Sequence, residues 1–163
     1  MTVMKKNWRD VGQTLYDEYG ASPIGPCRLF RCGRIDYCTH EELGCPMTIL
    51  NLRNDPDPSA SDLGWSGSAA NVSFLQLATE NKVERYDTAN PEVRNWLASI
   101  ASLLITERTQ WPVLLHCRSG KDRTGIAVAM LLKVLGVTDA EIMGEFLLCT
   151  DVKVSTITRN PSL

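Results

Sequence analysis

The sequence predicts an α/β fold in which helices flank a central, mostly parallel sheet of four to five strands. Two observations predict this class: four short apolar runs have the length and composition of buried strands, and stretches with helical periodicity lie between and after them. The chain has 163 residues, enough to bury a substantial core without disulfides, and we expect a single domain over residues 1–163.

Composition and charge narrow the classes of partner. Apolar residues make up 44% of the chain and charged residues 22%, with a formal net charge of −2, which does not favour a general nucleic-acid or anionic-membrane surface. The N-terminus lacks the apolar core of a signal peptide, and no apolar run approaches the length of a membrane span. We therefore expect a cytoplasmic protein with no nucleic-acid partner and no stable membrane insertion; the oligomeric state stays open.

The first half of the chain predicts one helix, one short helical turn and three strands. In order, we expect the helix, a strand, the turn and two further strands over residues 7–19, 28–35, 39–43, 47–53 and 72–78. Within the helix, Trp8, Val11 and Leu15 recur at helical spacing. Residues 59–71 are rich in Gly, Ser and Ala around an isolated Trp65, and we expect a flexible excursion there.

The second half predicts a strand and three helices. Residues 90–92, Asn-Pro-Glu, are a good helix start, because they supply a capping side chain, a first-turn proline and an acid near the positive end of the dipole. One apolar stripe follows, formed by Val93, Trp96, Leu97, Ile100, Leu103 and Leu104. Residues 113–117 read as a buried strand, residues 126–135 as a helix that is apolar nearly all round, and Thr138 with Glu141 as the capping box of a last helix.

The loop between that strand and the buried helix contains the candidate catalytic and anion-binding residues. Residues 116–125 read His-Cys-Arg-Ser-Gly-Lys-Asp-Arg-Thr-Gly. In a strand-loop-helix unit the loop N–H groups and the helix N-terminus converge on one point, a ready site for an oxyanion such as phosphate. Cys117 lies at the mouth of this site, where the helix N-terminus and the cations of Arg118, Lys121 and Arg123 favour the nucleophilic thiolate.

Spacing within the loop suggests a role for each side chain. Arg123 is the sixth residue after Cys117, so the chain between them can wrap one phosphate while the guanidinium binds two of its oxygens. Thr124 can donate to the Cys117 sulfur when it leaves a phosphocysteine, and we expect His116 to orient the loop through a hydrogen bond rather than to act as a base. The loop residues expected to line the phosphate site are Arg118, Ser119, Gly120, Lys121 and Asp122.

The pattern His-Cys, five residues, Arg-Thr-Gly resembles the signature of the cysteine-dependent protein tyrosine and dual-specificity phosphatase superfamily. Within it, the Gly-Lys-Asp-Arg-Thr-Gly loop is similar to that of the atypical bacterial, protozoan and fungal tyrosine phosphatases, and a lysine at the place of Lys121 also occurs in phosphoinositide phosphatases. The resemblance implies a dual-specificity-phosphatase-like fold and hydrolysis of phosphomonoesters through a phosphocysteine. It implies neither cofactor nor metal, because the loop amides and Arg123 neutralise the transition state.

The substrates implied by this resemblance are phosphorylated proteins, carrying phosphotyrosine and also phosphoserine or phosphothreonine. A phosphoinositide or an inositol phosphate is the alternative. A non-catalytic module that binds phosphorylated ligands is the rival from another class; it would keep Arg123 and lose the nucleophile or the acid, whereas Cys117 is present. Rhodanese-type sulfur transferases, arsenate reductases and RNA triphosphatases use related loops and are less well matched.

The general acid has three candidates. In families similar to this one it is an aspartate roughly thirty residues before the cysteine, placed to protonate the leaving oxygen, and Asp87 stands at that distance. No Trp-Pro-Asp is present, which separates this chain from the receptor-like and cytosolic tyrosine-specific branch. Glu84 on the same stretch and Asp122 inside the loop compete with Asp87, although Asp122 can equally be a helix N-terminal acid that offsets its basic neighbours.

Four residues outside the loop are further candidates for the site. Arg31 and Arg34 are candidates for lining an anion site, but we favour the interpretation that both are solvated arginines of an edge strand. Arg53 and Asp55 lie at the end of the strand over residues 47–53, where α/β sheets bind ligands, but turn formation explains Asp55 equally well.

The six cysteines are expected to be reduced, since an active thiolate needs a reducing compartment. Cys32, Cys38, His40 and Cys45 form a cluster that could suggest zinc, yet no Cys-x-x-Cys pair is present and we expect no metal. One of the other thiols could capture an oxidised Cys117; spacing does not choose among them.

Overall fold

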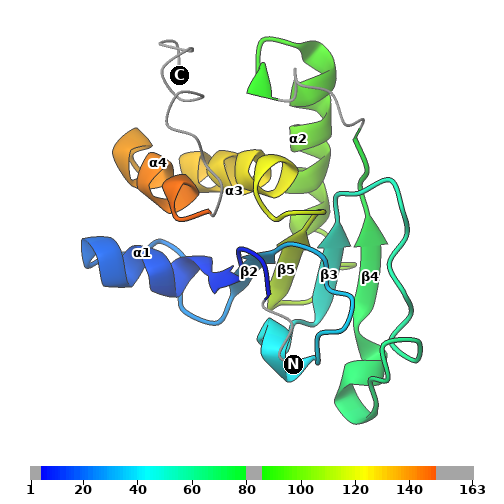
Figure 1. Ribbon diagram of the computed structural model, residues 1–163. Helices are drawn as coiled ribbons and strands as arrows, with labels where there is room; N and C mark the ends of the chain where they lie inside the picture. The colour runs from blue at the N-terminus through cyan, green and yellow to red at the C-terminus, as the bar shows by residue number, and fades with distance from the viewer. Residues whose placement is uncertain (1–4, 80–85, 150–163) are drawn as a thin grey trace.

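One five-stranded sheet runs through the protein in the order β1-β2-β5-β3-β4 (Figure 1). The computed structural model describes residues 5–79 and 86–149. The strands are β1 (Arg9–Asp10), β2 (Leu29–Cys32), β3 (Thr48–Asn51), β4 (Ser73–Gln76) and β5 (Val113–His116). The last four are parallel, and β1 runs antiparallel to β2. The predicted mostly parallel sheet is confirmed. β1 was not predicted, because a strand of two residues is too short to show a periodic pattern in the sequence.

β5 lies at the centre of the sheet, between β2 and β3. Its last residue, His116, is aligned with Cys32 of β2 and Asn51 of β3, so the three strands end level with one another. All four residues of β5 are buried, as expected for a parallel strand covered on both faces. The chain therefore leaves β5 at the carboxyl edge of the sheet, where open α/β sheets bind ligands.

In the described residues, four helices pack against the sheet, and two short 3-10 helices lie in its connections. They are α1 (Val11–Tyr19), η1 (Glu41–Leu43), η2 (Gly67–Asn71), α2 (Pro91–Leu104), α3 (Asp122–Val134) and α4 (Asp139–Leu147). The helix starts predicted at Asn90 and Thr138 are confirmed, because the Asn90 side chain accepts from the Glu92 N–H and Thr138 forms its capping box with Glu141. The helix expected over residues 7–19 begins only at Val11, because Arg9 and Asp10 pair with β2 as strand β1. α3 begins earlier than the apolar run alone predicts.

The two faces of the sheet have different covers. Neighbouring residues point to opposite faces of a strand, so Leu50 and Leu115 pack with side chains of α1, α2 and α3, while Ile49 and Leu114 pack in a second cluster. That second cluster is closed by the connections that contain η1 and η2. The helices thus occupy one side of the sheet, as Figure 1 shows, and irregular segments occupy the other.

The segment over residues 59–71 is not the flexible excursion expected from its composition. It contains η2, and Trp65 is only 8% exposed. The Trp65 indole donates a hydrogen bond to the Cys38 carbonyl at 3.0 Å, and its ring stacks on Phe74 with centroids 5.9 Å apart. One buried aromatic side chain with its N–H satisfied therefore fixes a segment whose other residues are small and polar.

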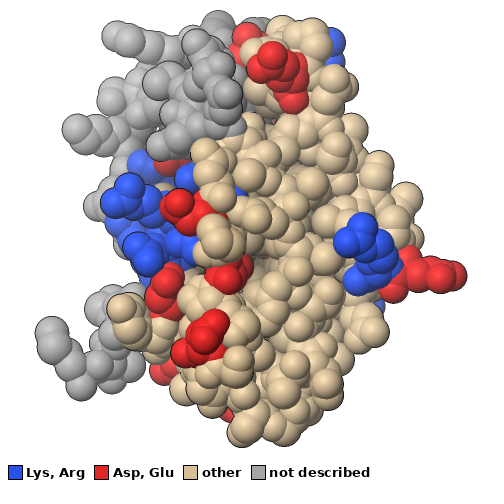
Figure 2. Space-filling model, turned by 90° about the vertical axis from the view of Figure 1, so that its right-hand side faces the viewer, with Lys and Arg blue, Asp and Glu red and all other residues tan. Residues whose placement is uncertain are grey.

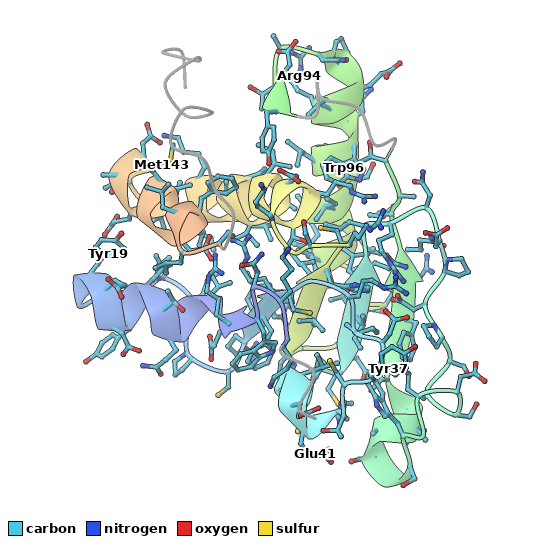
Figure 3. The ribbon with its side chains drawn as sticks, in the orientation of Figure 1. Tyr19, Tyr37, Glu41, Arg94, Trp96 and Met143 are labelled. Carbon is cyan, nitrogen blue, oxygen red and sulfur yellow. The ribbon has the colours of Figure 1, made fainter. Side chains whose placement is uncertain are left out.

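A tryptophan also joins α2 to the sheet. Trp96 lies on the buried face of α2, and its Nε1 donates to the Leu77 carbonyl just beyond β4 at 3.0 Å (Figure 3). This contact confirms the predicted packing of the α2 stripe on the sheet. Across residues 5–79 and 86–149, every helix is too short or too polar to cross a bilayer.

Candidate active site

The predicted strand, loop and helix meet around Cys117. β5 ends at His116 and α3 begins at Asp122, and we call residues 117–123 the phosphate loop. Cys117 and Arg123 are 2% and 7% exposed, so both lie at the base of the site rather than on the open surface. The N-terminus of α3, which is the positive end of the helix dipole, makes this a favourable place for an anion.

A cavity of about 330 Å³ opens over the phosphate loop. It is lined by Lys6, Arg34, Cys117, Arg118, Ser119, Asp122 and Arg123. Four of these side chains are cationic and one is a carboxylate, which suits an anionic ligand. Figure 2 shows a large group of lysine and arginine side chains at the left of the view beside several carboxylates and a smaller basic group at the right, while most of the face in view is uncharged. Gly120 and Lys121, expected to line the site, are not among the described residues that border the cavity.

The Arg123 guanidinium is held from the neighbouring strand. Its Nη1 donates to the Leu52 carbonyl at 2.9 Å, and Leu52 directly follows β3. A planar guanidinium that is already oriented loses less entropy when it binds two oxygens of a phosphate.

His116 and Arg53 share the buried carboxylate of Asp57. Its Oδ2 lies 2.8 Å from His116 Nε2, and its Oδ1 accepts from Arg53 Nη2 at 2.9 Å. All three side chains are at most 7% exposed. The hydrogen bond expected of His116 therefore joins the start of the phosphate loop to the segment after β3.

Asp57 is a residue that the sequence analysis missed. In the same segment, Asn-Asp-Pro-Asp-Pro over residues 54–58, the sequence analysis named Asp55 as the site candidate, but the Asp55 side chain is exposed. Each aspartate precedes a proline and is therefore extended. The local sequence consequently does not show which of the two aspartates lies in the site. Only the packing of this segment against β5 separates them.

The candidate acids lie in different surroundings. Asp122 lines the cavity, and its Oδ1 accepts a hydrogen bond from the Tyr86 hydroxyl at 2.6 Å. Asp87 is exposed, and its Oδ1 accepts from the Ala89 N–H at 3.0 Å in the turn before α2. Asp87 is not among the described residues that border the cavity. Glu84 lies outside the described residues.

The favoured reading of Arg31 as a solvated arginine of an edge strand is wrong. β1 covers that side of β2, and Arg31 is 0% exposed. Its Nη1 donates to Glu145 Oε2 at 2.5 Å, and its Nη2 donates to the Gly120 carbonyl at 2.8 Å. Burial lowers the pKa of Arg31, and the opposite charge of Glu145 works against that shift.

Arg34 and Lys6 bring positive charge to the cavity from outside the phosphate loop. The Arg34 side chain is 55% exposed and pairs with Asp36 at 2.8 Å, a hydrogen bond that raises the pKa of Arg34 and lowers that of Asp36. Lys6 reaches the cavity because its carbonyl accepts the Gly33 N–H at 2.7 Å, one residue before Arg34. No local pattern marks Lys6, since its place depends on how the N-terminal segment packs.

Thr124 is fully buried in the first turn of α3. Within residues 5–79 and 86–149 its hydroxyl has no hydrogen-bond partner. Buried hydroxyls are nearly always paired, so this donor is available for a group that arrives with the ligand or forms during a reaction.

All six cysteines are free thiols, and four of them are buried. Burial raises the pKa of the Cys32 thiol well above its usual range. His40, from the cluster that could suggest zinc, uses Nε2 in a hydrogen bond with the Pro46 carbonyl at 2.8 Å. In the described part of the chain, no group of three or more His, Cys, Asp and Glu side chains is arranged to hold a metal ion.

Comparison with known protein families agrees with this geometry. A profile described as the tyrosine phosphatase family matches residues 4–161. The chain belongs to this family. The match covers the phosphate loop, the sheet and the four helices of the described residues, so the resemblance first seen in ten loop residues extends over nearly the whole chain.

Two relatives are named phosphatases. Inositol diphosphatase DSP5 of Arabidopsis thaliana is 30% identical over 111 residues, which cover 66% of this chain and 52% of that protein. Triple specificity protein phosphatase PtpB of Mycobacterium tuberculosis is 33% identical over 95 residues, covering 58% of this chain and 33% of PtpB. The chain thus spans about half or less of each of these relatives.

A solved structure has the same fold. The core catalytic domain of the PP-IP phosphatase Siw14 from S. cerevisiae, in complex with citrate, superposes with a TM-score of 0.59 at 18% identity. The superposition covers 90% of this chain and 77% of the Siw14 chain. It shows that the two chains share the α/β fold that the sequence predicts.

Replacing Asp57 tests the shared carboxylate. Asp57→Ala leaves Arg53 buried without its counter-charge, and we expect the free energy of unfolding, measured in urea, to fall by about 3 kcal/mol. Asp55→Ala is the matched control two positions away and should change it by less than about 0.5 kcal/mol. Equal effects of the two substitutions would contradict the assignment.

Proposed function

We propose that this protein hydrolyses phosphomonoesters through a phosphocysteine on Cys117. The observation that carries the proposal is the cavity in which Cys117 and Arg123 border one cationic space at the N-terminus of α3. Membership of the tyrosine phosphatase family supports it. Because a thiolate nucleophile persists in a reducing compartment, we propose the cytoplasm as the place of action.

In the first step the Cys117 thiolate attacks phosphorus. The S–P bond forms as the P–O bond to the leaving group breaks, and the leaving oxygen takes a proton from a general acid. The loop N–H groups and Arg123 hold the three remaining oxygens while negative charge builds on them. In the second step water attacks phosphorus, the S–P bond breaks, and the Thr124 hydroxyl donates to the departing sulfur.

For the general acid, we propose Asp122 rather than Asp87. Asp122 lines the cavity with Cys117, and the hydrogen bond from the Tyr86 hydroxyl to its Oδ1 helps to fix its carboxyl group there. Asp87 is exposed and accepts a backbone hydrogen bond in the turn before α2. Spacing along the chain favoured Asp87; placement in the fold favours Asp122. After the first step the Asp122 carboxylate accepts a proton from the attacking water.

The first candidate substrate is a protein that carries phosphotyrosine, with phosphoserine or phosphothreonine as further substrates. The family description and the name of PtpB, a triple specificity protein phosphatase, support this class.

The second candidate is an inositol phosphate or a phosphoinositide headgroup. One phosphate needs only the loop and Arg123, yet Lys6, Arg34 and Arg118 add three further cations to the same cavity. A ligand with several phosphates would use that charge. The name of the relative DSP5, an inositol diphosphatase, supports this class.

Phosphate release from a substrate panel tests the function. The panel holds phosphotyrosine and phosphothreonine peptides and singly and multiply phosphorylated inositols, all assayed without metal. We expect release by the wild type and none by Cys117→Ser, because a serine hydroxyl is not ionised and is a far weaker nucleophile. The ranking of substrates decides between the two classes. Turnover that persists in Cys117→Ser would contradict the mechanism, and binding without release would favour a phospho-ligand-binding module.

The general acid is tested with aryl phosphates of graded leaving-group pKa. Asp122→Asn should slow turnover by about 10²- to 10⁴-fold for poor leaving groups and much less for good ones, since only a poor leaving group needs the proton. Asp87→Asn is the matched control. The steeper dependence appearing in Asp87→Asn instead would return the role to Asp87, and a uniform loss in Asp122→Asn would point to a purely structural carboxylate.

The extra cations are tested by Lys6→Ala and Arg34→Ala. If the ligand carries several phosphates, each variant should raise KM several-fold for multiply phosphorylated inositols and leave phosphotyrosine peptides less affected, because each lost charge weakens one contact. Lys133→Ala removes a lysine from the far end of α3, where it pairs with Asp139, and serves as the control. Equal changes for every substrate would argue against this second class.

A further inference from the structure

Three consecutive carbonyls of the phosphate loop are hydrogen-bonded from outside the loop. The pairs are Arg34 N–H to the Arg118 carbonyl at 3.3 Å, Asn7 Nδ2 to the Ser119 carbonyl at 2.7 Å, and Arg31 Nη2 to the Gly120 carbonyl at 2.8 Å. The donors come from the N-terminal segment, from β2 and from the residues after β2. Three separate interactions thus act on one short stretch of backbone.

The direction of these bonds determines where the loop N–H groups point. In a planar trans peptide the C=O of one residue and the N–H of the next point in opposite directions. Carbonyls held outward at 118–120 therefore turn the N–H groups of Ser119, Gly120 and Lys121 toward the side where the anion binds. Gly120 has φ of 67°, and a Cβ there would lie 2.4 Å from the Cys32 carbonyl carbon, so the loop also packs directly on the end of β2.

The Arg31 donor is itself firmly held. Its Nη1 is bonded to Glu145 of α4, and Arg9 bonds the other oxygen of the same carboxylate at 2.8 Å. Both guanidiniums also donate to Cys149 Sγ, at 3.1 Å from Arg31 and 3.3 Å from Arg9. Arg9 and Arg31 thus share two partners, but the contact with the phosphate loop belongs to Arg31.

We propose that Arg31 and Asn7 are positioning residues for the proposed phosphatase reaction. They hold the Gly120 and Ser119 carbonyls outward, so that the following N–H groups are aimed at the phosphate before it binds. Arg31 adds a buried positive charge behind the loop, which also favours an anion in front of it. The inference rests on the proposed function, because an aimed N–H cradle matters only where an oxyanion binds.

A purely structural salt bridge between β2 and α4 is the alternative reading of Arg31, and Arg9 provides the matched control. Arg31→Met and Arg9→Met each remove one guanidinium from Glu145 and Cys149 and leave the other guanidinium on both. Only Arg31→Met also removes the guanidinium from the Gly120 carbonyl, which then keeps only the long contact from Cys149 Sγ at 4.0 Å. Asn7→Gly removes the donor to Ser119, and glycine accepts the left-handed backbone at this position, where φ is 56°.

The experiment measures the affinity of each purified variant for tungstate and inorganic phosphate by calorimetry, and kcat and KM with an aryl phosphate, at a temperature where urea denaturation shows every variant folded. We expect Arg31→Met to bind both anions about ten- to a hundredfold more weakly and to lose kcat/KM in proportion. Asn7→Gly should weaken binding several-fold, and Arg9→Met should lose stability with its anion affinity unchanged.

Anion affinity in Arg31→Met and Asn7→Gly equal to that of Arg9→Met and the wild type would overturn the inference while leaving the phosphatase function standing. If Arg31→Met does not fold, unchanged affinity in Asn7→Gly alone overturns it. A wild type that binds neither anion and releases no phosphate would refute the proposed function, and this inference with it.

Discussion

The site depends on β5 being hydrogen-bonded on both sides. Because β2 and β3 flank it in parallel and end level with it, the residues that follow all three strands meet at one edge of the sheet. β5 leads to Cys117, β2 leads to Arg34, and β3 leads to the carbonyl that holds Arg123. Cys117 and the phosphate loop, which are adjacent in sequence, are thereby brought together with supports that follow two strands distant in sequence.

The local structure was predicted well, because it depends on residues close together in the chain. The strand, loop and helix around Cys117 follow from an apolar run, a glycine-containing basic loop and a second apolar run. The helix caps at Asn90 and Thr138 are equally local, since each capping side chain and its target lie within three residues. Four of the five strands were predicted for the same reason.

The positions of the other site residues depend on tertiary packing and could not be predicted from the local sequence. The local sequence does not distinguish Asp57 from Asp55, and only the contacts of Asp57 with His116 and Arg53 in the folded structure do so. Arg31 reads as a surface residue until β1 is known to cover β2, and Lys6 has no pattern at all. For the acid, distance along the chain favoured Asp87, while the fold brings Asp122 to the cavity. Residues that shape an active site by pairing across the fold produce no periodic pattern in the sequence.

The bonds that hold the phosphate loop also bear on the order of folding. Arg31 reaches Gly120 across 89 positions of the chain and Glu145 across 114, and Asn7 reaches Ser119 across 112. Contacts between such distant segments form only after long loops have closed. The cradle therefore takes its final shape late, once both the N-terminal segment and α4 have docked. During synthesis on the ribosome, Asn7 and Arg31 emerge before Cys117, whereas Glu145, which holds Arg31, emerges after it, so the cradle is completed only after α4 has been synthesised.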